Sequence, residues 1–261
     1  MTSALQIARS GLDALDQKMR AISNNLANVN TTGFKKDRAA FATLMYQDDR
    51  PPGSPSGSDS QYAVGLGTGT GVRVMGTERI HTQGSLTQTG NALDLAVEGE
   101  GMFAITLADG RTGYTRDGAF KLNAQGELVT ANGLKLVQAI AVPAGAESIT
   151  IATDGSVSAS VAGQTQPVEA GQIQISRFLN PAGLQPMGDN LYLETAASGA
   201  AATGAPGVDG AGAVRQGALE TSNVSTVQEL VDMIETQRAY EVNAKVINAA
   251  DEMARYVTQN V

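Results

Sequence analysis

The 261-residue chain has no cysteine and no tryptophan, and aromatic residues make up only 4% of it. The lack of cysteine excludes disulfides, thiolate metal ligands and a cysteine nucleophile. Hydrophobic residues still account for 42% of the sequence, so we expect a core of aliphatic side chains rather than large rings. The length predicts one large domain or two modest domains.

Basic residues are also scarce. There are 18 Lys and Arg residues against 26 Asp and Glu residues, which gives a net charge of −8. An acidic chain repels the phosphates of nucleic acids and anionic lipids, so we expect neither as a partner. No apolar run approaches the about 20 residues that a membrane span needs. Residues 1–20 carry charges every few positions, unlike a cleaved secretory signal peptide.

Histidine occurs once, as His81, which argues against an enzyme. A Ser-His-Asp triad would need His81, yet no G-x-S-x-G motif accompanies it, and a zinc site needs several ligands. The glycine run GLGTGTG at 65–71 lacks the third glycine of a dinucleotide fingerprint and precedes a predicted strand rather than a helix. We therefore expect no catalytic residue, cofactor or metal. A hydrolase that uses His81 is the weakest alternative.

Long helices are predicted at both ends of the chain. Apolar residues within 3–29 recur at alternating three- and four-residue steps, the pattern of a coiled-coil strand. A second apolar stripe runs from 227 to 257, and its spacing drifts towards an 11-residue repeat. At the start of this stripe, Thr226 and Glu229 have the spacing of a capping box. Because a helix with one narrow stripe is unstable alone, we expect the two helices to form a coiled-coil-like domain.

Between the helices the hydrophobic period changes to two. Apolar and polar residues alternate around Asp-Gly and other glycine-containing turns, which predicts antiparallel hairpins. Pro-, Gly- and Ser-rich tracts flank this part and favour flexible connectors. The expected fold is α+β, with an antiparallel β-rich domain inserted between the terminal helices. The expected segments are 1–45 (helix and helix stop), 46–64 (linker or extended segment), 65–197 (β-rich domain), 198–224 (linker) and 225–261 (helix).

The stretch NNLANVNTTGFKK at 24–36 has two interpretations. Asn and Thr compete for backbone groups and favour helix ends, so Asn28 followed by Gly33 predicts a helix stop and a turn. Asn24 and Asn25, however, lie within the helical pattern, where their amides could contact neighbouring chains. Both interpretations remain open from the residues alone.

Three long segments resemble one protein family, the bacterial flagellar rod and hook axial proteins. The segment SGLDALDQKMRAISNNLANVNTTGFKK is similar to the N-terminal signature of that family, and ETSNVSTVQELVDMIETQRAYEVNAKVINAADEM is similar to its C-terminal signature. The segment GEGMFAITLADGRTGYTRDGAFKLNAQGELVTANG is similar to the opening of its β-domain. Met102 stands where the family more usually has Phe, a volume-tolerant difference. Within the family, the length and the β-domain are most similar to subunits of the distal rod.

The resemblance implies a non-enzymatic structural subunit. Family members are exported unfolded through the flagellum's own channel, without a cleaved signal peptide, and assemble into a hollow helical tube. The implied place is the basal body, from the periplasm to the outer membrane, and the implied role is a drive shaft that transmits torque to the hook. The implied partners are further copies of the chain, proximal rod proteins, the hook protein, the surrounding P- and L-ring proteins and the flagellar export apparatus.

The helical stripes and the family signatures together predict a subunit interface. Polar residues within it could fix the register between subunits, because buried polar groups discriminate between helix packings. The predicted interface residues are Leu5, Leu12, Leu15, Met19, Ile22, Asn24, Asn25, Leu26, Asn28, Leu230, Ile234, Gln237, Arg238, Tyr240, Asn243, Val246 and Met253.

Segment 46–64 lies where the resemblance implies a rod-specific bridge between subunits. Its composition instead favours a flexible linker, so we expect a segment that is loose in the monomer and ordered by neighbours. The predicted rod-specific residues are Tyr46, Pro51, Pro52, Pro55 and Tyr62.

Two alternatives stay open at this point. One is a proximal rod or hook subunit of the same family. The other, from a different class, is a dimeric β-domain binding module whose helical ends only hold two copies together. The module predicts a discrete dimer, whereas an axial subunit predicts open helical polymerisation through heterologous contacts.

Overall fold

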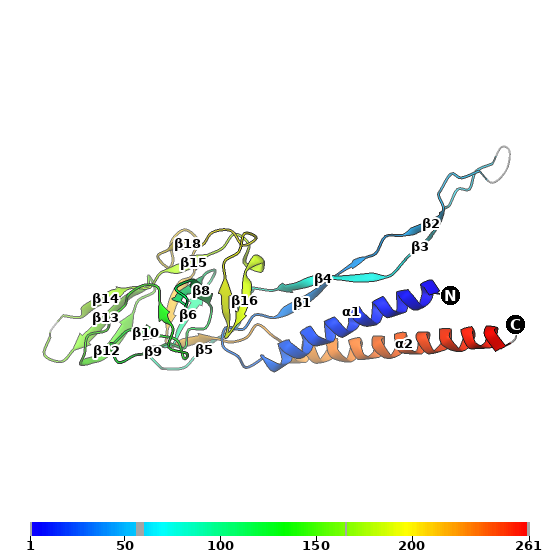
Figure 1. Cartoon of the computed structure of the whole chain (residues 1–261). Coiled ribbons are helices and arrows are strands. Elements are labelled where there is room, and N and C mark those ends of the chain that lie inside the picture. Colours follow the sequence, from blue (N-terminus) through cyan, green and yellow to red (C-terminus); the bar gives the residue numbers. More distant parts are fainter. Residues whose placement is uncertain (1, 56–59, 165, 260–261) are drawn as a thin grey trace. The chain divides into compact units, whose positions relative to one another are not determined.

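The computed structural model describes residues 2–55, 60–164 and 166–259. Along the sequence, helix α1 (Thr2–Ala27) comes first and helix α2 (Thr226–Gln259) comes last, and strands β1 to β20 lie between them in the chain (Figure 1). The expected fold class, α+β with a coiled-coil-like domain of terminal helices, is wrong. In the described part of the chain two α-helices accompany twenty strands whose recorded pairings are antiparallel, so the chain is mostly β.

The chain divides into two compact units, each built from separate stretches of sequence. Unit 1 comprises Met1–Leu26, Asp37–Glu78 and Ser225–Val261, and unit 2 comprises Ala27–Lys36 and Arg79–Val224. Unit 1 therefore contains both helices, and unit 2 contains most of the strands.

In unit 1, α1 and α2 run side by side and antiparallel (Figure 1). Two contacts fix their register: Asn25 hydrogen-bonds Glu229, and a Cβ on Gly11 would lie 3.7 Å from Nδ2 of Asn243. Small and polar side chains dominate the buried face. The buried helical residues are Ala8, Ala14, Ala21, Ile22, Asn25, Glu229 and Thr236.

These buried residues explain why the coiled-coil prediction failed. Leu12, Leu15 and Met19 of the expected seam are only half-buried. The expected stripe of α2 is exposed, with Ile234 49% and Val242 60% exposed. A knobs-into-holes seam requires both apolar stripes to face each other, and here they do not.

Unit 1 also contains two pairs of strands. Strand β1 (Asp37–Thr43) pairs with β4 (Val72–Arg79), and β2 (Gln47–Arg50) pairs antiparallel with β3 (Leu66–Thr68). The backbone N–H of Val72 donates to Ser10 Oγ of α1 at 3.2 Å. Segment 46–64, expected as a linker, thus contributes a strand, and Arg50 stacks its guanidinium 3.7 Å from the centre of the Tyr62 ring.

Unit 2 contains several antiparallel sheets, and the largest has nine strands. Its order is β16-β17-β8-β7-β11-β10-β9, with β15 pairing both β7 and β18. Segment 198–224, expected as a linker, contributes β18, β19 and β20. The bounds are β5 Leu86–Gln88, β6 Leu95–Glu98, β7 Met102–Thr106, β8 Thr112–Thr115, β9 Lys121–Leu122, β10 Leu128–Val129, β11 Lys135–Leu136, β12 Ala146–Ile151, β13 Ser156–Val161, β14 Val168–Gln172, β15 Ile175–Arg177, η1 (a 3₁₀ turn) Pro181–Gly183, β16 Gln185–Gly188, β17 Leu191–Leu193, β18 Ala202–Gly204, β19 Ala213–Gln216 and β20 Ala218–Glu220.

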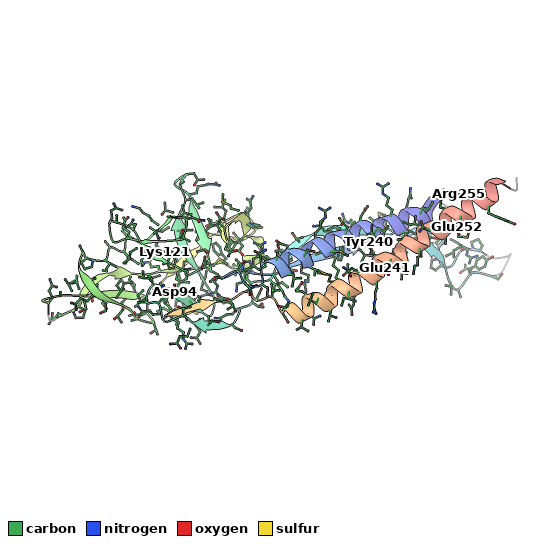
Figure 2. The ribbon with its side chains drawn as sticks, turned by 90° about the horizontal axis from the view of Figure 1, so that it is seen from below. Asp94, Lys121, Tyr240, Glu241, Glu252 and Arg255 are labelled. Carbon is green, nitrogen blue, oxygen red and sulfur yellow. The ribbon has the colours of Figure 1, made fainter. Side chains whose placement is uncertain are left out.

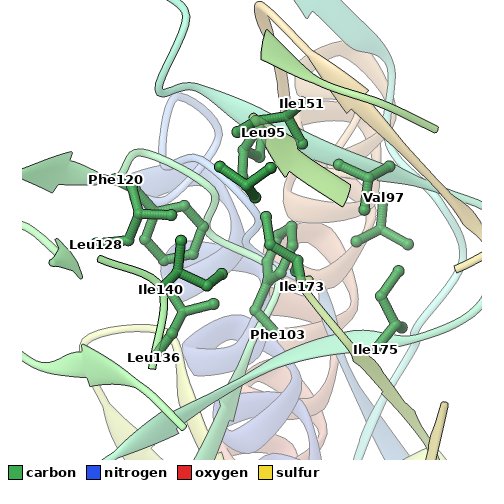
Figure 3. Packing of buried hydrophobic residues seen from close by; sticks show 12 residues of the cluster. Leu95, Val97, Phe103, Phe120, Leu128, Leu136, Ile140, Ile151, Ile173 and Ile175 are labelled. Carbon is green, nitrogen blue, oxygen red and sulfur yellow. The ribbon is translucent and has the colours of Figure 1, made fainter. Parts of the chain in front are cut away.

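Strand β7 separates two hydrophobic clusters because successive strand residues point to opposite faces. Phe103 lies in the larger cluster, where its ring meets Phe120 edge-on with centroids 5.2 Å apart (Figure 3). Met102 and Ala104 lie in a second cluster with Tyr114. The core of unit 2 is therefore built around a strand that is buried on both faces.

Candidate functional site

Helix α2 presents an apolar stripe to solvent, which we call the α2 stripe. Its members recur at steps of three, four, seven or eight residues, and each residue is 44% or more exposed. Such contiguous exposed apolar surface is typical of a protein–protein contact. The α2 stripe consists of Val227, Val231, Ile234, Val242, Val246 and Met253.

The other residues predicted for an interface are distributed over both helices. Tyr240 projects from α2, as do Glu241, Glu252 and Arg255 (Figure 2). Among the predicted apolar residues of α1, Ile22 is buried and the others are half-buried, so they pack at least partly within the chain. The remaining predicted residues of α2 lie as follows: Leu230, Gln237 and Arg238 are exposed, and Asn243 is half-buried beside Gly11.

Asn25 joins three elements of unit 1. Only 2% of its surface is exposed. Its Nδ2 donates to the backbone oxygen of Asp37 at 2.9 Å and to Oε2 of Glu229 at 3.1 Å, while its Oδ1 accepts from the Asp37 N–H at 2.8 Å. Glu229, which the capping-box pattern singled out, is therefore a partner of α1. The side chain of Asn25 faces the interior of unit 1.

Asn28 lies just after the end of α1. Its Oδ1 accepts a hydrogen bond from Thr31 Oγ1 at 3.2 Å, and its backbone oxygen accepts from the Thr31 N–H at 3.1 Å. Gly33 then adopts a φ of 67°, which favours glycine. The stretch 24–36 thus contains both a helix-ending turn and, at Asn25, a polar contact.

Replacing Asn25 by Ala should lower the free energy of unfolding of unit 1 by about 2–3 kcal/mol, because the buried Glu229 carboxylate loses a donor and the Asp37 backbone loses two hydrogen bonds. Urea titration followed by far-ultraviolet circular dichroism measures this loss. Asn24→Ala is the matched control: Asn24 is exposed, and we expect a change within about 0.5 kcal/mol. Equal losses in the two variants would contradict the role assigned to Asn25.

The five predicted rod-specific residues, Tyr46, Pro51, Pro52, Pro55 and Tyr62, are all exposed. Other apolar side chains of the β1–β4 and β2–β3 ribbons are also exposed, among them Met45 at 88% and Met75 at 65%. A two-stranded ribbon is at best marginally stable in water. This part of unit 1 is therefore a second exposed apolar surface.

Unit 2 contains a buried ion cluster that sequence reasoning missed. The Lys35 Nζ lies 2.5 Å from Glu220 Oε1, and neither side chain is exposed. Nζ also donates to the backbone oxygen of Thr82 at 2.8 Å, and the Gly84 N–H donates to Glu220 Oε1 at 2.8 Å. Burial lowers the pKa of Lys35, and the Glu220 carboxylate opposes this effect. Lys35 and Glu220 are 185 positions apart, so no local pattern indicates the pair.

Arg116 completes this cluster. Its Nε lies 3.6 Å from Glu220 Oε2, and its side chain is 5% exposed. The guanidinium also donates to the backbone oxygens of Val97 at 3.0 Å and Gly99 at 2.5 Å. Burial lowers the pKa of Arg116, while Glu220 and Glu100 oppose the shift. Two buried cations thus share one buried carboxylate.

Asn223 hydrogen-bonds segments of unit 2 that also contribute to this cluster. Its Oδ1 accepts from the Lys36 N–H at 2.8 Å, and its Nδ2 donates to the backbone oxygens of Ile80 at 2.8 Å and Thr82 at 3.1 Å. Segments 34–36, 80–84 and 220–223 are therefore held together by side-chain contacts.

The single histidine has a packing contact. The His81 ring meets the Tyr192 ring edge-on, with centroids 5.4 Å apart. Across the described residues no group of three or more His, Cys, Asp and Glu side chains has a metal-binding arrangement. Within those same residues, neither helix has the length and apolar character needed to span a bilayer.

Comparisons with known proteins place these features in a family. A family model described as flagella basal body rod protein matches residues 5–35, and the flagellar hook protein FlgE/F/G D1 domain matches 96–159. The flagellar basal body rod FlgEFG protein C-terminal model matches 215–260. The flagellar basal-body rod protein FlgG of Buchnera aphidicola subsp. Acyrthosiphon pisum is 48% identical over 259 residues, covering 99% of this chain and all of the relative. The chain belongs to the FlgG family of flagellar basal-body rod proteins.

Two further relatives are also flagellar basal-body rod proteins. FlgG of Agrobacterium fabrum is 46% identical over 259 residues, which cover 99% of both chains. FlgF of Caulobacter vibrioides is 33% identical over 265 residues, which cover 100% of this chain and 98% of the relative. The resemblance read from the three sequence segments is confirmed, and the chain is a structural subunit of the flagellar basal-body rod.

Proposed function

We propose that this chain is the subunit of the distal rod and that its copies polymerise into a hollow helical tube that transmits torque to the hook. The observation that carries this proposal is the exposed α2 stripe, whose outermost members Val227 and Met253 are 74% and 60% exposed. Burying such side chains contributes about 25 cal/mol for each Å² of apolar surface removed from water. The relatives named as rod proteins support burial of this stripe in an assembly.

In the described residues the α2 stripe stays exposed rather than packing against α1, and this favours a heterologous contact. In such a contact, unlike surfaces of successive copies meet, and the assembly grows as an open helix unless the rotation closes a ring. The ribbon residues Tyr46 and Tyr62 supply a second surface, which we infer bridges neighbouring subunits. In this proposal the chain performs no catalysis.

The place and partners of the subunit follow from the same proposal. The tube would extend from the periplasm to the outer membrane within the basal body. Its ends would meet proximal rod proteins and the hook protein, and its sides would face the P- and L-ring proteins. Delivery would use the flagellar export apparatus, without a cleaved signal peptide.

Replacing Val242 by Glu should raise the critical concentration for polymerisation at least about tenfold, because a carboxylate is costly to bury in an apolar contact. Sedimentation and electron microscopy of purified protein measure the polymer. The monomer should keep its helix content, since Val242 is 60% exposed and makes little internal packing.

The matched control is Asn248→Glu, which adds the same charge at an exposed position of α2 outside the stripe. Equal polymerisation by both variants would contradict an interface at the α2 stripe. A discrete dimer of the unmodified chain would instead support the binding-module alternative. Limited proteolysis of the same samples checks the ribbon: cleavage within 46–64 should be slower in polymer than in monomer.

A further inference from the structure

Unit 2 contains a cavity of about 320 Å³ beside the buried ion cluster. Its lining includes the buried side chains of Arg116 and Met102, each 5% exposed, and of Ser176, which is not exposed. A cavity of this volume is large enough for a side chain or a small organic ligand. The charges and apolar groups of its lining indicate the class of ligand that it fits.

The cavity has a cationic character. Arg116 belongs to the cluster in which two buried cations share the Glu220 carboxylate. The second lining cation is Arg177, whose Nη1 donates to the backbone oxygen of Asp209 and whose buried Nε has no hydrogen-bond partner. The Arg177 side chain is 34% exposed, whereas Arg116 is buried in a cluster of two cations and one carboxylate. The buried excess of positive charge favours an incoming anion.

One acidic side chain also lines the cavity. Glu100 Oε2 lies 3.7 Å from Arg177 Nη2, but 81% of the Glu100 side chain is in solvent. An ion pair as exposed as this one is weak because water screens it. The carboxylate of Glu100 therefore offsets the two arginines only in part, and it would repel a doubly charged anion more than a singly charged one.

The rest of the lining combines polar side chains, those of His81, Thr82 and Ser176, with an apolar part. Phe178 and Pro181 stand beside Met102, and the Phe178 ring is held edge-on against Tyr114 with centroids 4.7 Å apart. A ligand that fills this site therefore combines a single negative charge with an apolar group.

We propose that the cavity binds a carboxylate carried on an apolar group, and that its occupant in the assembled protein is an acidic side chain of a second copy of this chain. Arginine N–H groups form strong hydrogen bonds to carboxylates. Arg116 already donates through Nη1 and Nη2 to backbone oxygens, so we assign the direct contact to Arg177 and a supporting positive charge to Arg116. Each copy offers many carboxylates, since its 26 acidic residues exceed its 18 basic ones. The identity of the occupant rests on the proposed self-assembly, whereas the chemistry of the site does not.

Titration of the monomer with hydrocinnamate, a carboxylate on a phenyl-bearing chain, tests the site. Calorimetry or NMR should show saturable binding with a Kd on the order of 1 mM, as expected for a fragment of this size. The corresponding alcohol and inorganic phosphate should bind at least about tenfold more weakly. Arg177→Gln should weaken hydrocinnamate binding about tenfold. Arg111→Gln, at an exposed arginine paired with Asp109, should leave it unchanged.

Each outcome decides a part of the proposal. Absence of hydrocinnamate binding, equal binding of the alcohol, or no effect of Arg177→Gln overturns the carboxylate site. Loss of hydrocinnamate binding on polymerisation supports a second copy as the occupant, and equal binding by monomer and polymer overturns it. The Val242→Glu monomer should still bind hydrocinnamate. A failure of polymerisation is thereby distinguished from a failure of the cavity.

Discussion

Glu220→Gln should lower the free energy of unfolding of unit 2 by about 3–5 kcal/mol, the cost of removing one partner from a buried ion pair. The substitution keeps the shape of the side chain but removes the carboxylate that Lys35 and Arg116 share. In the described cluster that carboxylate lies 2.5 Å from Lys35 Nζ and 3.6 Å from Arg116 Nε. Lys35 would then be buried without its carboxylate partner, and Arg116 would keep only the influence of Glu100. Urea or guanidinium titration of the monomer, followed by tyrosine fluorescence, measures the change.

Two comparisons separate this effect from a general loss of charge. Glu98→Gln removes a carboxylate that is 61% exposed and 4.0 Å from Arg215, and we expect a change within about 0.5 kcal/mol. Adding Lys35→Met to Glu220→Gln should recover part of the loss, because it removes the cation that has lost its carboxylate partner. A loss that is the same for Glu98→Gln and Glu220→Gln would contradict the cluster's role.

The pH dependence of stability has a definite sign at Lys35. Burial holds its folded-state pKa below the ordinary value of 10.5, so between those two pKa values the unfolded chain binds more protons than the folded chain. The contribution of Lys35 to stability therefore rises as pH increases through the folded pKa towards 10.5. Removing the Glu220 carboxylate takes away an influence that raises this pKa, so the window of rising stability should begin at lower pH in Glu220→Gln.

Local periodicity predicted where helices and strands form, but it did not predict which residues these elements contact. The three- and four-residue steps locate α1, and alternation around Asp-Gly turns predicts strands where β7, β8, β12 and β13 lie. The direction in which the apolar stripe of α2 faces was not predictable. That direction is set by Gly11 beside Asn243 and by Asn25 bonded to Glu229, contacts between opposite ends of the chain.

The same limit applies to the composition of 198–224. Its Gly- and Ala-rich sequence favours a connector, yet β19 pairs with β6 and β20 pairs with β5. Strand formation there depends on partners more than a hundred positions earlier, because strand preference depends strongly on tertiary context. The ion cluster escaped prediction for the same reason: Lys35 and Glu220 carry no signal until the fold brings them together.

Gly118→Ala should destabilise unit 2 by at least about 3 kcal/mol, near the upper end for overpacking, because the new methyl collides with backbone rather than with a flexible side chain. A Cβ at Gly118 would lie 1.6 Å from the backbone oxygen of Leu95. The Leu95 N–H donates to the Gly118 oxygen at 3.0 Å, so the two segments cannot separate without losing this pairing.

The matched control for Gly118→Ala is Gly204→Ala in β18, where a Cβ would meet nothing within 4 Å. Its stability should change by no more than about 0.5 kcal/mol, and thermal unfolding of both variants measures the difference. Leu95 opens β6, and Val97 of the same strand accepts a hydrogen bond from Arg116. Displacing β6 should therefore also weaken hydrocinnamate binding in any Gly118→Ala protein that still folds, whereas Gly204→Ala should bind it normally. Equal stability of the two variants would mean that β6 accommodates the added methyl group. It would contradict the inference that the position of β6 holds Arg116 in place.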